Sequence, residues 1–129
     1  MHFMNKREAQ FSIKFRHWLM SKRDDAKSEM TCSYEIKSTR GKERFALREL
    51  KEAQIDYGKA IKYGKKGVLI RTEGQEGLPD YIFMKNQPAR VVIHFPQGFV
   101  ICDIEAFDFC KKKSLNWEEI QEYSIKTIE

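Results

Sequence analysis

Cysteine, histidine and proline are scarce in this chain of 129 residues, which contains three of each. The cysteines and histidines are Cys32, Cys102, Cys110, His2, His17 and His94. An odd number of cysteines does not make a disulfide framework, and neither residue type has the spacing of a zinc site. We therefore expect no zinc, and reduced cysteine thiols in the core.

Long apolar runs and low-complexity tracts are also missing. Runs such as Val91-Val92-Ile93 are far shorter than the ~20 residues that a membrane-spanning helix needs. The first eight residues include basic side chains but no apolar segment ahead of a cleavage site, so no secretory signal is predicted. No linker rich in proline, glycine or serine divides the chain. We therefore expect a single domain over residues 1–129 that is cytoplasmic and has no membrane partner.

The chain is basic, with a formal net charge of +5 and charged residues at 33% of the sequence. A positive protein can neutralise the phosphates of a nucleic acid, but many proteins of this charge bind none. The charge is therefore compatible with a nucleic-acid partner and does not establish one.

The stretch from Cys32 to Ser38 predicts a strand with one apolar and one charged face. Side chains alternate along a strand, so Glu35 and Lys37 share one face while Tyr34 and Ile36 share the other. A carboxylate that binds a hard divalent cation, beside an ammonium that orients or deprotonates a water, suits a hydrolase of phosphodiesters. The alternative is an exposed ion pair on a half-solvated strand.

A helix is predicted before this strand, beginning near Asn5. Its apolar stripe consists of Phe11, Phe15, Trp18 and Leu19. Glu8 lies one turn before Phe11 on nearly the same side. It is either a first-turn charge favoured by the helix dipole or a group aimed into a site beneath the helix.

A second helix is predicted from Phe45 to Tyr63. Its core-facing positions are Leu47, Leu50, Gln54, Tyr57 and Ile61. Gln54 is the polar member, and an unsatisfied buried amide costs about 1–3 kcal/mol. Gln54 therefore either caps a neighbouring backbone group or reaches the same site as Glu35 and Lys37.

Four more strands are predicted at residues 68–72, 80–84, 89–95 and 98–104. Their short connections predict mostly antiparallel pairing. Asp80 opens one of them directly after a proline, as a turn residue or as a carboxylate at the sheet edge. Asn116 and Glu119 form a capping-box pattern that begins a short terminal helix, with Trp117, Ile120 and Tyr123 facing inward.

The predicted order of elements is a helix with Glu8, a strand with Glu35-Ile36-Lys37, a helix with Gln54 and then several strands. In this order the chain resembles the PD-(D/E)xK nuclease superfamily. It is most similar to the small phage and bacterial recombination nucleases of the Holliday junction resolvase-like, or RecU-like, kind. The resemblance covers about Glu8 to Phe107. It is also carried by the segments 45–54, 78–81 and 89–93.

The resemblance implies a mixed α/β fold, in which helices flank the central mixed β-sheet of a restriction-endonuclease-like core. It implies Mg²⁺ or Mn²⁺ as the cofactor and no small-molecule cofactor. The metal ligands would be Glu35, Asp80 and Glu8. Lys37 would position or activate the attacking water, and Gln54 would orient that water or the lysine.

One departure from the family pattern concerns the acid of the Pro-Asp motif. In the family this Asp precedes the Glu-x-Lys strand, whereas here Pro79-Asp80 follows it. A rearranged strand order would bring Asp80 beside Glu35. If the acid is instead missing, the metal site is incomplete.

The implied function is metal-dependent endonucleolytic cleavage of branched or duplex DNA. The implied enzyme is a homodimer, and it acts in the host cytoplasm if the chain is phage-encoded. A homodimer is expected because resolvases cut two strands symmetrically. The expected DNA-backbone contacts are Arg40, Lys42, Arg44, Lys65, Lys66, Lys111, Lys112 and Lys113. The rivals are a catalytically impaired module that binds DNA or a protein, and a nuclease that prefers ends, nicks or plain duplex.

Overall fold

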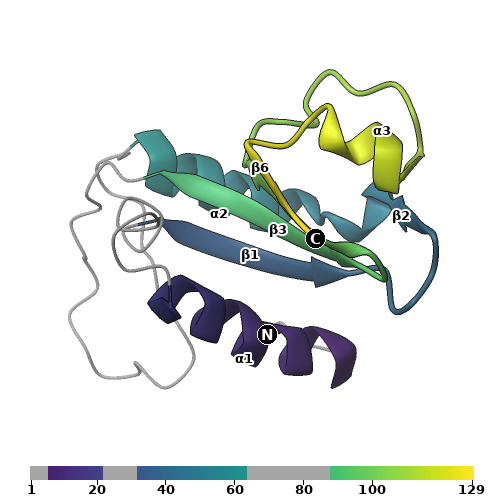
Figure 1. Ribbon diagram of the computed structural model, residues 1–129. Helices are drawn as coiled ribbons and strands as arrows, with labels where there is room; N and C mark the ends of the chain where they lie inside the picture. Colours follow the sequence, from purple (N-terminus) through teal and green to yellow (C-terminus); the bar gives the residue numbers. More distant parts are fainter. Residues whose placement is uncertain (1–5, 22–31, 64–87) are drawn as a thin grey trace.

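The computed structural model describes residues 6–21, 32–63 and 88–129. Four of the described strands form a mixed sheet with helices on both faces (Figure 1), and two more form a separate antiparallel pair. The predicted strands at residues 68–72 and 80–84 lie outside the described residues, and so does Asp80. The mixed α/β class predicted from the sequence is confirmed.

The sheet has the strand order β1-β3-β4-β6. Its strands are β1 (Ser33–Ser38), β3 (Ala89–Phe95), β4 (Gly98–Asp103) and β6 (Lys126–Ile128). Strands β3 and β4 form the predicted antiparallel hairpin, and β6 pairs antiparallel with β4. Strand β1 pairs parallel with β3, with Glu35 opposite Val91 and Lys37 opposite Ile93. The expectation of antiparallel pairing concerned the later strands with short connections, and it is confirmed for β3 and β4. Strand β1 pairs parallel because its partner lies far away in the sequence.

Helix α1 (Lys6–Ser21) covers one face of this sheet (Figure 1). The predicted stripe is correct, because Phe11 and Phe15 are buried against Val92, Phe99 and Ile101. The aromatic side chains of Tyr34 and Trp18 complete this cluster, together with Leu19, Ile36 and Ile128. The apolar face predicted for β1 is thus the face that α1 covers.

Helix α2 (Glu52–Tyr63) lies over the other face. The predicted helix start at Phe45 is wrong. Phe45 lies in strand β2 (Arg44–Ala46) and is followed by a 3₁₀ turn, Leu47–Glu49, before α2 begins. Strand β2 pairs with β5 (Ser114–Asn116), and Phe45 opposite Leu115 is 1% exposed. This long-range pairing overrides the local helical pattern.

The short helix α3 (Trp117–Gln121) follows β5 and begins with the predicted capping box. The Asn116 side chain accepts a hydrogen bond from the Glu119 N–H at 2.8 Å, and Glu119 Oε1 accepts one from the Asn116 N–H at 3.0 Å. Trp117 and Ile120 are buried, as expected. No helix within the described ranges is long and apolar enough to cross a membrane.

Candidate functional site

Glu35 and Lys37 project from the α2 face of β1, opposite the side chains that pack on α1. The Lys37 Nζ lies 3.7 Å from Glu35 Oε1. The Lys37 side chain is 5% exposed, whereas that of Glu35 is 26% exposed. The alternative interpretation was an exposed ion pair on a half-solvated strand. The structure differs from it, because the Lys37 ammonium is buried and only the Glu35 carboxylate is partly exposed.

Glu35 and Gln54 line the same small pocket between β1, α2 and the start of β3. Its volume is about 30 Å³, which is room for roughly two waters. A phosphodiester would therefore lie across the mouth of this pocket and not inside it. The structure brings together two of the predicted catalytic residues here, from strand and helix, with Lys37 beside Glu35.

Gln54 also has the structural role that the sequence left open. Its Oε1 accepts a hydrogen bond from the Lys51 backbone N–H at 3.3 Å. Lys51 directly precedes α2, so Gln54 supplies the returning half of a capping box and satisfies a donor that the helix cannot. The two interpretations of Gln54 are compatible, because capping holds the amide at the pocket wall.

Glu8 is 5% exposed on α1, the helix that covers the other face of the sheet. Glu35 projects from the α2 face of β1, so the sheet lies between the helix that carries Glu8 and the Glu35 side chain. Glu8 and Asp80 were the other two predicted metal ligands. Asp80 lies outside the described residues.

Within the described parts of the chain, no three side chains of the metal-ligating types His, Cys, Asp and Glu are clustered to hold a metal ion. Glu35 is the carboxylate that lines the pocket. Magnesium sites in enzymes often use one or two protein carboxylates, and water and substrate phosphates complete the shell. The described pocket offers one carboxylate, that of Glu35. This fits a magnesium site completed by water and substrate phosphates, and it does not fit a site in which the protein supplies all the ligands.

A tight turn after β1 carries part of the predicted DNA-binding surface. The Lys42 N–H donates to the Thr39 carbonyl at 3.1 Å, and Arg40 and Gly41 have φ values of 58° and 84°. Positive φ at both central positions is the type I′ pattern. A hollow of about 80 Å³ beside this turn is lined by four basic side chains, those of Arg40, Lys42, Arg44 and Arg48.

Three of the predicted DNA contacts are engaged within the protein, and the first is Arg40, which pairs with Glu49 at 4.0 Å. Arg44 pairs with Glu119 at 3.0 Å, and Lys112 pairs with the same carboxylate. Lys111 and Lys113 are exposed. Lys65 and Lys66 lie outside the described residues.

The sequence interpretation missed a second group of charges at the rim of the small pocket. Arg90 lines the pocket and pairs with Asp103 at 3.3 Å. Asp103 also pairs with Lys62 at 2.9 Å, and Lys62 pairs with Glu105 at 2.7 Å. The hydrogen bond to Glu105 raises the pKa of Lys62, and the same contact lowers the pKa of Glu105. The sequence did contain a signal for this group, namely the two carboxylates Asp103 and Glu105 at the end of β4.

Comparisons of this chain with protein families, with curated proteins and with solved structures found no match.

Proposed function

We propose that this chain is a metal-dependent DNA endonuclease of the PD-(D/E)xK type, with a restriction-endonuclease-like core and a preference for branched DNA. The observation that supports this most is the Glu35 and Lys37 pair. A buried ammonium 3.7 Å from a partly exposed carboxylate is costly as a structural element alone, since desolvating two charges often offsets their attraction.

Each residue has a distinct task in this proposal. Glu35 would hold a Mg²⁺ or Mn²⁺ ion, which when bound supplies the charge that polarises the scissile phosphate and acidifies water. Lys37 would place its positive charge next to the developing negative charge of the phosphate. Gln54, held by its hydrogen bond to Lys51, would orient the attacking water at the pocket wall.

The basic turn after β1 would hold the DNA backbone. Arg40, Lys42 and Arg48 line one hollow at the end of the strand that carries Glu35. Contacts of this kind position a duplex and carry little sequence information. Symmetric cutting of a junction requires two sites, so the proposal includes a homodimer.

The test is cleavage of a labelled synthetic four-way junction with Mg²⁺ or Mn²⁺. We expect cleavage by the unmodified protein and its loss in Lys37→Ala and Glu35→Ala. Arg16→Ala and Glu118→Ala remove one positive and one negative charge at exposed positions and should cleave normally. Flap, nicked and linear substrates in parallel decide between a junction resolvase and a nuclease of another preference. Equal cleavage by Lys37→Ala and unmodified protein would reject the proposal.

A second candidate is a nuclease-fold module that binds DNA or a protein without cutting. The observation that favours it is the single carboxylate that lines the described pocket. Junction binding in a gel-shift assay, with no nicking under either metal, would select this candidate.

A further inference from the structure

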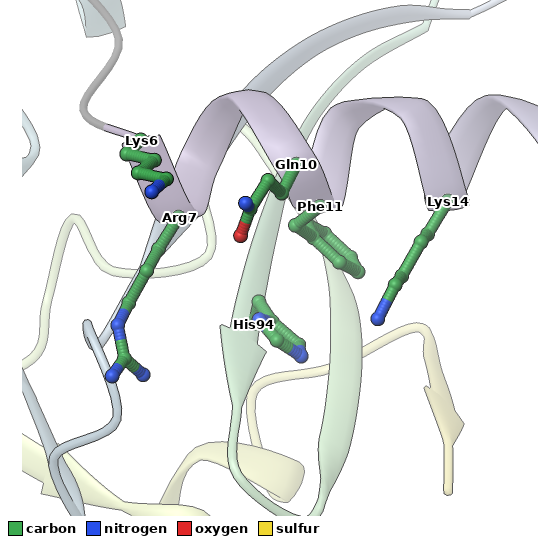
Figure 2. A pocket seen from close by; sticks show the side chains of 6 residues that line it. All are labelled: Lys6, Arg7, Gln10, Phe11, Lys14 and His94. Atoms are coloured by element: carbon green, nitrogen blue, oxygen red, sulfur yellow. The ribbon is translucent and has the colours of Figure 1, made fainter.

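A larger pocket lies on the opposite face of the sheet from Glu35, between α1 and the end of β3. Its volume is about 350 Å³. Figure 2 shows its lining, which consists of Lys6, Arg7, Gln10, Phe11, Lys14 and His94. Three of these six side chains are cationic and none is acidic.

The lining residues of α1 form one stripe along the helix. Positions 6, 7, 10 and 14 recur at helical spacing, and the stripe is about 12 Å long at 1.5 Å per residue. In Figure 2 the side chains of Arg7 and Lys14 extend from the helix on either side of His94. The cationic groups are thus spread along the pocket and are not gathered at one point.

Two aromatic rings stack within the pocket lining. The rings of Phe11 and His94 are stacked, with centroids 4.3 Å apart and an angle of 2° between their planes. Burial lowers the pKa of His94, and the nearby charges of Lys14 and Arg7 lower it further. His94 therefore offers a neutral ring and adds no charge to the site at neutral pH.

The side chains of Lys6, Arg7 and Lys14 are exposed. Among the described residues, none of the ion pairs involves Lys6, Arg7 or Lys14. The Arg7 guanidinium rests against Gly41, where any Cβ would collide with it. Unneutralised cations along a concave surface raise the local concentration of anions.

We infer that this pocket binds a row of phosphates. The axial rise per phosphate of one duplex strand is about 3.4 Å, and adjacent phosphates of an extended strand lie farther apart than this, so the stripe faces about two or three consecutive phosphates. The polar amide of Gln10, between the cations, adds a hydrogen-bond donor to phosphate oxygen. The same chemistry is carried by a nucleoside triphosphate, and the length of the stripe favours the strand. This inference does not rest on the proposed cleavage, because it concerns other residues on the other face.

The test is binding of a fluorescein-labelled single-stranded oligonucleotide, followed by anisotropy in EDTA so that no cleavage occurs. We expect Lys14→Gln to weaken binding by about three- to tenfold, and Arg7→Gln/Lys14→Gln to weaken it further. The slope of log affinity against log salt should become shallower by about 0.7 for each lost phosphate contact. Arg16→Gln and Arg16→Gln/Lys51→Gln remove the same charges at exposed positions away from the pocket and should bind normally.

Two further arms identify the source of the phosphates. Competition by ATP and tripolyphosphate at concentrations where inorganic phosphate has no effect would assign the site to free nucleotides. Displacement only by unlabelled oligonucleotide would assign it to a strand. The His94 imidazole resonances should move on binding in either case. Equal affinity and equal salt slopes for the Lys14→Gln and Arg16→Gln proteins would overturn the inference, whether or not the protein cuts DNA.

Discussion

Gly58 of α2 packs directly against Ile104, such that a Cβ on Gly58 would lie 2.6 Å from both Cδ1 and Cγ1 of that side chain. Ile104 is 2% exposed. A glycine inside a helix normally costs about 1 kcal/mol relative to alanine. The close approach to Ile104 explains why glycine occupies this position at the pocket wall.

We expect Gly58→Ala to lower the free energy of unfolding, because overpacking costs about 1–3 kcal/mol and exceeds the gain in helix propensity. Urea denaturation measures the change. Adding Ile104→Val, which removes Cδ1, should recover part of the loss. Ala53→Gly at an exposed position of α2 reports the propensity effect alone. A Gly58→Ala protein more stable than the parent would show that the Ile104 side chain moves aside freely.

Lys37→Met separates a catalytic role of the buried ammonium from a structural one. Methionine fills a similar volume without the charge, and removing one partner of an ion pair is costly mainly where it leaves the other charge buried and uncompensated. Since Glu35 is 26% exposed, water can solvate its carboxylate once the lysine is gone. We expect the free energy of unfolding to stay within about 1 kcal/mol of the parent. A loss of about 3 kcal/mol or more in urea denaturation would mark the pair as structural.

Glu119 should make stability depend on acid pH. Its hydrogen bond with Lys112 and that from the Asn116 N–H lower the pKa of the carboxyl from 4.5 to about 2. A carboxyl with a lowered folded-state pKa stabilises the fold above its unfolded pKa, and that contribution is lost as the pH falls through the folded value. Glu119→Gln should therefore be less stable than the parent at pH 6, and the difference should shrink between pH 5 and about 2.

Urea midpoints measured across this pH range test the prediction, with Glu118→Gln as the control. Glu118 is the neighbouring exposed carboxylate of the same helix. A difference between the parent and Glu119→Gln proteins that is constant with pH would contradict the assigned pKa.

Local patterns predicted the parts of the fold that local interactions determine. The capping box at Asn116 and Glu119 is present, because its two hydrogen bonds join residues three positions apart. The apolar stripe through Phe11 and Phe15 follows from helical periodicity and is buried as expected. The alternation along β1 likewise placed Glu35 and Lys37 on one face.

Pairings between distant segments were not predictable from local patterns. Phe45 fits a helical period with Leu47 and Leu50, yet it pairs with Leu115 in a two-stranded sheet. The parallel pairing of β1 with β3 likewise cannot be predicted from the local sequence of either strand. For the same reason the pocket of Arg7 and Lys14 was missed, since it exists only where α1 crosses the end of β3 at His94.

The parallel pairing of β1 with β3 also has a consequence for how the chain folds. The β3–β4 hairpin closes through a two-residue turn, whereas joining Ser33 to Ala89 requires closure of a long loop, which is the slower event. A nascent chain would thus acquire its β3–β4 hairpin before Lys37 loses contact with water. The environment of that lysine would be among the later features to form once the chain leaves the ribosome.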